Sequence, residues 1–500
     1  MKKTKITVPK SVYKNQNILI RSIFEKAASP RKVLCVVLDY AKEKHVALCC
    51  DGQGDILKKS FPVENNPAGV DFLCKEIQST ARRRKIKKET IFIGGEDEPS
   101  YVANFVAALS TKGYLVMRVN AREAKRQREN MLASTDNLDL LGIAKCLLGR
   151  RCSPASSAQK QKPVYREIRE LSRQRRSYVR QKTACSNRIH TVADQLFPSF
   201  LNSSLSGITP FSKASLALMK DRFSSSQFSR RKQKSFSNTL RRLRVKQAPK
   251  TAYQLIELSK NTLPPVPERI AVLQNSLTSL IELYECLEKN ALLLREQNAA
   301  LLATTPYIML TSIPGISFVL ACGLAGELGD PIHLRPTGSL CAYAGIVPAV
   351  AQTGGPDAPA IHLSTRARCN HILKDYLVQG AQKIALCGPQ EHKDRFAKRE
   401  ARGQHAAYAG ARTLLRLGRN LITHETPYLN PAARCNGASK DEIESGCLET
   451  WNKLTEKWRV MPNWQTALTD ESCPMGFWRR VVKELHDIQL PITAVRSREK

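Results

Sequence analysis

Residues 33–61 have the sequence VLCVVLDYAKEKHVALCCDGQGDILKKSF, and this stretch decides the fold of the first third of the chain. An Asp-Gly step, Asp51-Gly52, lies inside it and is a strong signal for a β-hairpin. The largely apolar runs around this step are Val33–Leu38, His45–Cys50 and Ile56–Phe61. Together they predict three consecutive strands, with Asp39 closing the first.

The segments that follow alternate between helical and extended patterns. A basic loop at 82–88 separates the first helix from the next strand. We expect helices near 67–80, 99–111 and 131–148, and strands at 90–93 and 114–119. A three-strand meander followed by alternating helices and strands is the order of a ribonuclease-H-like α/β domain, which we place at residues 30–150.

The charge of the 500-residue chain restricts its partners. It contains 79 lysines and arginines against 44 acidic residues, a net charge of +35. Such self-repulsion is best offset by a polyanion, which favours DNA or RNA over a small metabolite or an acidic membrane surface. Ala299–Gly326 carries no charge, but Pro306, Pro314 and Gly315 interrupt it, so a buried helix–turn–helix is a better interpretation than a membrane span.

The cysteines and the N-terminus indicate a reducing compartment. The fifteen cysteines are odd in number and form no Cys-x-x-Cys pair, which favours free thiols over disulfides or a zinc site. The basic start MKKTKITVPK is not followed by the apolar core of a signal peptide. We therefore expect a cytoplasmic protein, associated with the nucleoid if it binds DNA.

Residues 160–303 predict a basic, helical, coiled-coil section with a Ser-rich insertion at 200–250. Apolar residues recur at spacings of three and four between Ile168 and Leu196 and again between Leu273 and Leu301. One polar residue, Asn298, interrupts the second seam, and such a residue can set register and partner number. The seam predicts an interface that assembles protomers; a long helix packed within its own chain is the alternative.

The C-terminal part divides into two further sections. Residues 304–428 are Gly- and Ala-rich and predict a helical domain with irregular turns. All four tryptophans lie in the 429–500 extension, where aromatic and basic residues alternate. Stacking on unpaired bases and a small hydrophobic core both fit this pattern.

Four carboxylates stand where metal-dependent chemistry would need them. Asp39 closes the first predicted strand, and Glu96 follows the strand at 90–93. Asp136 and Asp139 are three residues apart in a predicted helix, so they share one face. If the fold brings the four together, their repulsion requires bound cations. Two Mg²⁺ ions held by carboxylates are the usual device for activating oxygens at phosphorus.

These residues lie in motifs that resemble the DEDD-type transposases of bacterial insertion sequences, which act as bridge-RNA-guided serine recombinases. The resemblance covers roughly residues 33–428. In the N-terminal half it rests on Leu38-Asp39-Tyr40-Ala41-Lys42, on Glu96 and Tyr101, on Thr135-Asp136-Asn137-Leu138-Asp139, and on the stretch from Leu171 to Arg188, which is similar to the family's basic helical hairpin. In the C-terminal half it rests on Ser312–Ile316, Gly329-Asp330-Pro331, Tyr343–Pro348 and Arg412–Arg416.

The resemblance implies a RuvC-like domain that holds Mg²⁺ through Asp39, Glu96, Asp136 and Asp139. It also implies a helical transposase domain, a dimer or tetramer, a structured guide RNA and DNA exchange through a covalent protein–DNA link. The family's nucleophile is a serine, but this chain has Ala351-Gln352-Thr353-Gly354-Gly355 at that place. Thr353 is therefore the candidate nucleophile, with a turn residue as its alternative, and Ser364 is another hydroxyl nearby.

Three interpretations of function remain open from the sequence. The first is the RNA-guided transposase. The second is a junction-resolvase-like nuclease that cuts with water and leaves Thr353 idle, and the third is an inactive nucleic-acid-binding relic.

The turn Ile313-Pro314-Gly315-Ile316 is either a phosphate contact of helix–hairpin–helix type or a tight interhelical turn.

Overall fold

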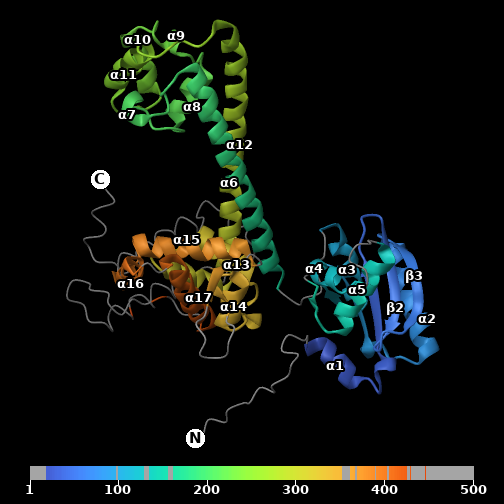
Figure 1. Cartoon of the computed structure of the whole chain (residues 1–500). Coiled ribbons are helices and arrows are strands. Elements are labelled where there is room, and N and C mark those ends of the chain that lie inside the picture. Colours follow the sequence, from blue (N-terminus) through green and yellow to red (C-terminus); the bar gives the residue numbers. More distant parts are fainter. Residues whose placement is uncertain are drawn as a thin grey trace. The chain divides into compact units, whose positions relative to one another are not determined.

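The computed structural model describes residues 18–96, 100–128, 135–155, 162–351, 361–365, 369–388, 390–402, 405–424, 428 and 445. Chain contacts divide the molecule into two compact units, residues 1–160 and 161–500 (Figure 1). The predicted nucleophile Thr353 and, apart from Ser445, the 429–500 extension with its tryptophans lie outside the described residues.

The first unit is built on a mixed six-stranded sheet with the strand order β3-β2-β1-β4-β5-β6. β1 pairs antiparallel with β2 and parallel with β4; β4 and β5 are also parallel, and β6 is antiparallel to β5. The strands are β1 (Leu34–Asp39), β2 (Lys44–Asp51), β3 (Ile56–Glu64), β4 (Ile91–Gly95), β5 (Leu115–Arg118) and β6 (Ser153–Pro154). The sheet confirms the predicted α/β class of this part of the chain.

The predicted hairpin turn forms where the Asp-Gly signal places it. Asp51, at the end of β2, is buried, and its Oδ1 accepts hydrogen bonds from the backbone N–H groups of Gln53, Gly54 and Asp55 at 2.9, 3.0 and 3.0 Å. An aspartate whose side chain accepts hydrogen bonds from the next backbone N–H groups stabilises a turn through local contacts. Such a turn can therefore be predicted from the sequence.

Helices cover both faces of the sheet. Leu34, Val36 and Leu38 of β1 point into a core shared with α2 (Pro67–Arg84) and α3 (Ala103–Thr111). The alternate residues Cys35 and Val37 point into a second core on the opposite face. The helices of that face are α1 (Ile18–Lys26), α4 (Ala121–Arg126) and α5 (Asp136–Leu148). The result is a three-layer domain, in which the period-two alternation of β1 serves two hydrophobic cores.

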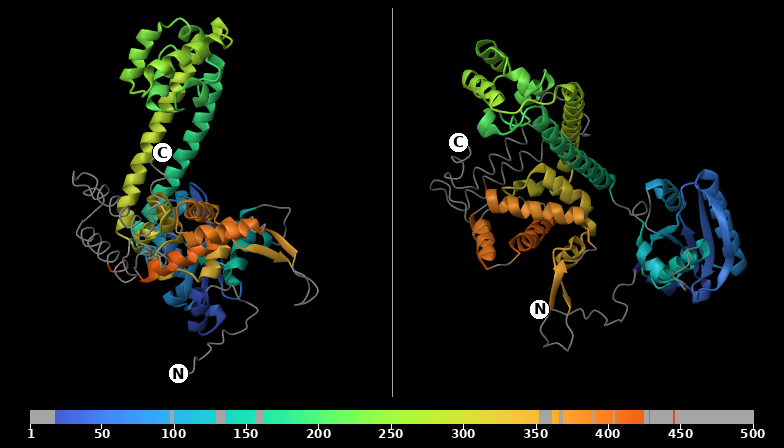
Figure 2. Two further views of the ribbon diagram at one scale, coloured as in Figure 1. Left: turned by 90° about the vertical axis from the view of Figure 1, so that its left-hand side faces the viewer. Right: turned by 45° about the horizontal axis from the view of Figure 1, so that its top comes forward.

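The second unit is organised around two long antiparallel helices, α6 (Pro163–Leu196) and α12 (Pro267–Ala303) (Figure 2). At 1.5 Å per residue, each is about 50–55 Å long. Three cross-helix contacts fix the register: Ser172 with Asn298, Lys182 with Glu288, and the Cys185 thiol with the carbonyl of Leu280. The pair has one hydrophobic core at each end.

The partner of the second predicted seam differs from the expectation. Leu277, Leu287 and Leu294 are buried, and the helix that packs along α12 is α6 of the same chain. Asn298 is 2% exposed, and its Nδ2 donates to the hydroxyl of Ser172 at 2.7 Å. The seam therefore closes an intrachain hairpin, because a helix that returns antiparallel within the chain satisfies the same heptad pattern as a second chain does.

At one end of the hairpin lies a helical base. Its core contains Tyr307, Leu310, Ala321 and Leu377, among others. Its elements are the 3₁₀ helix Pro306–Ser312, α13 (Phe318–Leu328), the 3₁₀ helix Pro331–His333, α14 (Thr337–Ala344), the two-stranded sheet β7 (Pro348–Ala351) and β8 (Ile361–Thr365), α15 (His371–Cys387), α16 (Gln390–Ala401) and α17 (Ala406–His424). The uncharged stretch 299–326 is thus a buried helix–turn–helix, as predicted. Among the helices of the described chain, none is long and apolar enough to span a membrane.

At the other end lies a tip module, defined here as residues 197–266. Its helices are α7 (Ser203–Ser206), α8 (Lys213–Lys220), α9 (Ser225–Phe228), α10 (Gln233–Arg242) and α11 (Ala248–Lys260). Several of its serines are N-caps: the hydroxyl of Ser212 accepts from the N–H of Ser215, and that of Ser224 from Gln227. Capping thus accounts for two of the serines of this Ser-rich segment, while α7 is capped by Asn202.

Candidate functional site

Two of the four predicted carboxylates lie on neighbouring parallel strands. The register of β1 and β4 pairs Leu38 with Gly95. Asp39 and Glu96 are therefore the next residues along these two neighbouring segments. Adjacent strands are about 4.8 Å apart, and parallel strands present their carboxyl ends at one edge. Both residues are half-buried there. The register therefore sets Asp39 next to Glu96, as a shared carboxylate site would require.

Asp39 faces the side of the sheet that α5 covers. Asp39 alternates with Val37, which belongs to the α5-side core. Gly94, two residues before Glu96, lies so close to α5 that a Cβ there would stand 2.4 Å from a methyl carbon of Leu147. Because side chains two apart on a strand share a face, Asp39 is directed toward the layer that contains α5, and Glu96 directly follows the last residue of β4 at the same edge.

α5 begins at the acidic pair predicted from the sequence. Thr135 is its N-cap; its Oγ1 accepts from the N–H of Leu138 at 3.4 Å, and its carbonyl accepts from the N–H of Asp139 at 3.0 Å. Asp136 is the first residue of the helix, and its side chain lies outside the description. Carboxylates in a first helical turn are favoured by the positive end of the helix dipole.

Asp139 has an arginine as its neighbour. Its carboxylate forms an ion pair with Arg128, and the two side chains are only 19% and 10% exposed. Among the side chains that the structure describes, no group of three His, Cys, Asp or Glu residues is close enough to hold a metal ion. The donor set at the strand ends still fits Mg²⁺, because carboxylate oxygens are the protein ligands this ion takes.

A second predicted site lies in the helical base, at the β7–β8 hairpin. The strands pair antiparallel, with Pro348 opposite Thr365 and Ala349 opposite Leu363. Ser364 is therefore the extra residue of a β-bulge, a feature that often occurs next to active sites. Thr353 comes two residues after the end of β7, outside the described chain.

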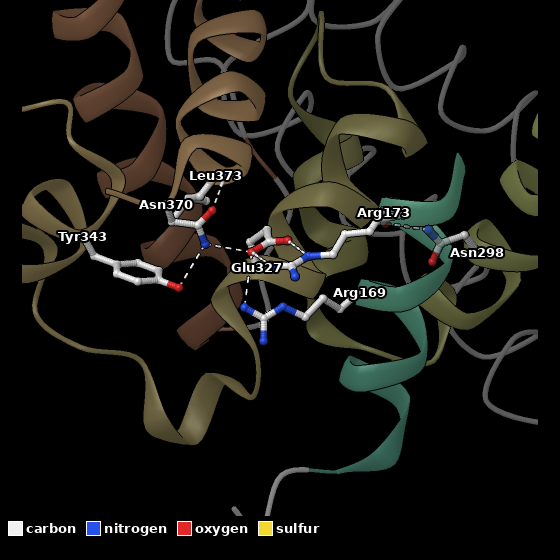
Figure 3. A network of polar contacts seen from close by, with 8 residues as sticks. Arg169, Arg173, Asn298, Glu327, Tyr343, Asn370 and Leu373 are labelled. Carbon is white, nitrogen blue, oxygen red and sulfur yellow. Dashed lines mark hydrogen bonds and ion pairs between the residues drawn. The ribbon is translucent and has the colours of Figure 1, made fainter. Parts of the chain in front are cut away.

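The residues that flank the β7–β8 hairpin are connected to α6 through a buried carboxylate, Glu327 of α13 (Figure 3). The Glu327 side chain is 2% exposed. Arg173 donates to both of its oxygens, at 2.8 and 3.1 Å, and Arg169 donates to Oε2 at 3.3 Å. The Nδ2 of Asn370 donates to the same Oε2 at 2.7 Å.

Asn370 extends this network to both ends of the segment that contains Thr353 and Ser364. Its Nδ2 also donates to the hydroxyl of Tyr343 at 2.9 Å, and its backbone N–H donates to the Tyr343 carbonyl at 2.8 Å. Its Oδ1 accepts from the N–H of Leu373 and so caps α15. Residues 343 and 370, which flank the hairpin, are thereby fixed to each other and to α6.

The hydrogen bonds of the network shift the pKa values of Glu327 and Arg173. Burial alone would raise the pKa of the Glu327 carboxyl, but hydrogen bonds from Arg173 and Asn370 outweigh it and hold the pKa below its usual range. The hydrogen bond to Glu327 raises the pKa of Arg173. Glu327 is therefore an ionised, fully partnered carboxylate, and its role is structural.

The turn at 313–316 packs tightly and also borders a cavity. Gly315 has φ +98°, and a Cβ there would lie 2.8 Å from the carbonyl oxygen of Lys383, so the turn rests directly on α15. A cavity of about 770 Å³ beside it is lined by Ser317, Lys383 and Lys393, among others. Both interpretations of the turn remain compatible with this geometry.

Comparison with known families matches both units. Residues 36–198 match the model of the DEDD transposases of the IS110 group, and residues 308–397 match that of the transposase IS116/IS110/IS902 family. The chain belongs to the IS110-type transposases. No curated protein matches it in the corresponding search.

The two family matches of this IS110-type transposase correspond to distinct parts of its structure. The first spans the sheet from β1 onward together with α6, and the second spans the base from its first 3₁₀ helix into α16. Between them lie residues 199–307, which include most of the tip module and α12. As members of a transposase family, such proteins act on DNA, cutting and rejoining it.

Sequence reasoning missed the Glu327 network of this transposase. Arg169 and Asn370 have no pattern of their own, and Arg173 appears only as one of many cations on α6. The available signal was Glu327 itself, the first charge after the long uncharged stretch that begins at Ala299. A lone acid in an otherwise apolar helix needs a partner, but its position along the chain does not reveal which one.

Proposed function

We propose that this transposase cuts and rejoins the DNA strands of a mobile element in a Mg²⁺-dependent reaction, with Asp39, Glu96, Asp136 and Asp139 as the metal ligands. The observation that carries the proposal is the pairing of β1 with β4, which sets Asp39 beside Glu96 under the layer that contains α5. When bound there, two Mg²⁺ ions stabilise the attacking and leaving oxygens at phosphorus.

The chain's own residues prepare this site in two ways. Gly94 lets α5 approach the strand ends, where Leu147 would otherwise clash with a Cβ. Arg128 offsets the charge of Asp139, which lowers the repulsion among neighbouring carboxylates while no other cation is present. Rearrangement of the Arg128–Asp139 pair frees Asp139 to act as a ligand.

The covalent step is assigned to Thr353. Its hydroxyl oxygen bonds to phosphorus as the bond from phosphorus to one nucleotide oxygen breaks, and the hydroxyl proton ends on that leaving oxygen. One DNA end then stays joined to the protein through a phosphodiester, and attack by another DNA hydroxyl rejoins the strand and restores the threonine. The Glu327 network supports this role because it fixes both flanks of the β7–β8 segment.

The family and the charge support the proposed partners. A structured guide RNA specifies the DNA sites, and the net charge of +35 supports binding of two nucleic acids at once. The catalytic domains act together in a dimer or tetramer, in which the acidic site and the nucleophile meet. The 313–316 turn, beside Lys383 and Lys393, contacts a phosphate of the bound strand.

A metal-specificity switch tests the acidic site. Replacing Asp39 by cysteine exchanges a hard oxygen ligand for a soft thiolate, which binds Mg²⁺ poorly and softer divalent ions better. We expect the Asp39→Cys protein to cut labelled DNA less well in Mg²⁺ and to regain cutting in Mn²⁺. Equal loss of cutting in both ions would remove Asp39 from the metal site.

An adduct-trapping experiment tests the nucleophile. On a nicked suicide substrate, we expect the covalent link at Thr353, identified by mass spectrometry of the digested protein. Thr353→Ser should react faster because it lacks the crowding methyl group, and Thr353→Val should not react. Cutting without any adduct would favour the hydrolytic nuclease, and tight RNA binding without cutting would favour the inactive relic.

A further inference from the structure

The tip module concentrates positive charge to an unusual degree. Its 70 residues contain thirteen lysines and arginines but only two acidic residues, a net charge of +11. Almost a third of the net charge of the chain is thus carried by a seventh of its residues. Residues 230–250 alone contain nine basic side chains and no acidic one.

Eight of these nine side chains are exposed, and none of the eight forms an ion pair with another described residue. They are Arg230, Lys232, Lys234, Arg241, Arg242, Arg244, Lys246 and Lys250. The ninth, Arg231, is half-buried over the rings of Phe228 and Phe236 and pairs with Asp221 at 3.3 Å. Arg231 therefore stabilises the module, whereas the other eight are directed to solvent.

A rigid scaffold presents these cations. Phe197, Phe200, Phe223, Phe228 and Phe236 are at most 2% exposed and contact one another, mostly edge to face. Phe236 and Leu240 anchor the inner side of α10 in this core. A basic segment held by a packed aromatic core loses less conformational entropy on binding than a disordered tail does.

The geometry of α10 divides the charge into two groups. Arg230, Lys232 and Lys234 lie at its start, and the remaining five exposed cations follow from its last turn to the start of α11. The ten-residue helix is about 15 Å long, which is comparable with the roughly 12 Å width of the major groove of B-DNA. Between the groups, Lys234, Asn238 and Arg241 share one polar face.

The same surface lacks what a protein or membrane partner would need. Between residues 206 and 252, all of which the structure describes, no large apolar side chain is exposed, and the exposed apolar side chains of the module, Leu205, Tyr253, Leu263 and Val266, lie outside this basic segment. Protein interfaces are anchored by buried aromatic or aliphatic side chains, and membrane insertion requires an apolar face. A surface of exposed cations without such anchors is typical of contacts to nucleic-acid phosphates.

We infer that the tip module is a separate binding site for the phosphate backbone of a nucleic-acid duplex, with α10 laid across a groove and its two basic groups on opposite phosphate strands. Neither family match reaches residues 230–250. The site lies at the far end of the α6–α12 pair from the base that holds the β7–β8 hairpin (Figures 1 and 2). It therefore acts as an additional binding site for a duplex, separate from the acidic site.

The test compares two full-length variants that each lose five positive charges. The tip variant carries Arg230→Gln, Lys232→Gln, Lys234→Gln, Arg241→Gln and Arg242→Gln. The control variant carries Lys26→Gln, Lys59→Gln, Lys75→Gln, Arg188→Gln and Lys289→Gln, whose side chains are exposed but scattered. Binding of a 20-base-pair DNA duplex and of a 20-base-pair RNA duplex is measured over a range of salt concentrations.

Loss of five phosphate contacts should reduce the slope of log affinity against log salt by about 4 for DNA. We expect at least about a 100-fold loss of affinity at low salt for the tip variant and less than about threefold for the control. A loss confined to one duplex assigns the module to that nucleic acid, and a loss on both assigns it to the shared backbone. Equal behaviour of the two variants on both duplexes would overturn the inference.

Folding is checked by a third variant. Arg231→Gln removes the cation that packs on Phe228 and Phe236, so it should lower the melting temperature while leaving the salt slope unchanged. If the tip variant with five substitutions does not fold, the double variant Arg230→Gln/Lys232→Gln replaces it. This variant changes only the turn before α10 and should lower the slope by about 2. An unchanged slope for a folded double variant would also overturn the inference.

Discussion

Asp139 and Glu327 are both carboxylates paired with arginine, but their surroundings differ. Glu327, in the helical base, is 2% exposed and accepts hydrogen bonds from two arginines and from Asn370. Asp139, on α5 of the first unit, is 19% exposed and forms an ion pair with Arg128. α5 packs against β1 and β4. Glu327 is buried among its partners, whereas Asp139 is partly exposed and pairs with one arginine in the described chain. We propose that Asp139 joins Asp39 and Glu96 in the metal site.

This difference indicates how each carboxylate contributes to the molecule. A buried carboxylate whose oxygens are all used holds packed elements together, and its removal leaves other charges without partners. A carboxylate at the edge of a sheet, near others of its kind, adds repulsion that a bound cation relieves. Substitutions at the two places should therefore affect different measurements, stability in one case and strand cutting in the other.

The largest effect is expected at the strand ends. Asp39→Asn removes one charge from the acidic site without changing side-chain size. Since even the outer-shell partners of metal ligands are worth roughly 10- to 100-fold, we expect more than about a 100-fold loss of Mg²⁺-dependent cutting of end-labelled DNA. The melting temperature should hardly change. Undiminished cutting by the variant would separate Asp39 from catalysis.

The next largest effect is expected at Glu327. Glu327→Gln leaves Arg169 and Arg173 without their shared partner and should destabilise the second unit by about 3 kcal/mol, at the low end for buried pairs because both arginines reach solvent. Thermal unfolding measures the loss. Glu391→Gln, which breaks only the exposed pair with Arg395 on α16, is the matched control and should cost less than about 0.5 kcal/mol. Equal losses would show that the burial of Glu327 is irrelevant.

A smaller effect is expected from pH. The pKa of Glu327 is lowered in the folded chain, so its contribution to stability is present above the ordinary glutamate range and is lost as the pH falls through the lowered pKa. The melting temperature of the wild type should therefore drop on acidification more than that of Glu327→Gln. Parallel pH profiles for the two proteins would contradict the assignment of an ionised, hydrogen-bonded carboxylate.

The smallest effect compares two helix caps. Thr135→Ala removes the cap of α5, and Ser212→Ala removes the cap of α8 in the tip module; each should cost about 1 kcal/mol. The cap of α5 also positions the turn that contains Asp136 and Asp139, so only Thr135→Ala should slow cutting, by several-fold. A similar decrease in cutting for Ser212→Ala would mean that general destabilisation is responsible.

Local signals allowed much of the first unit to be predicted. The predicted strands at 33–38, 45–50, 56–61, 90–93 and 114–119 each fall within a few residues of β1 to β5 at either end. Apolar runs and the Asp51 turn are properties of short segments, which explains this success. The short elements α1, α4 and β6 were not predicted, because a few residues carry too little periodicity to be recognised.

The second unit shows what a local pattern cannot contain. The heptads of α12 predicted an interface but not its partner, since α6 lies 70 residues earlier in the chain and satisfies the same seam. The Glu327 network joins α6, α13 and the cap of α15, and its residues become neighbours only when the chain folds. Of the predicted site residues, Asp39 and Glu96 are adjacent because strand order follows from the fold class. Thr353 lies outside the described residues, so its relation to them stays a prediction.

We propose that the carboxylates at the sheet edge perform the chemistry, while the buried carboxylate Glu327 stabilises the second unit. The most direct test measures DNA cutting and melting temperature side by side for Glu96→Gln and Glu327→Gln, which are the same chemical change at the two places. We predict that Glu96→Gln loses cutting and keeps its melting temperature, while Glu327→Gln loses stability and, below its melting temperature, still cuts. Cutting retained by Glu96→Gln, or a large loss of stability in that variant alone, would contradict the account.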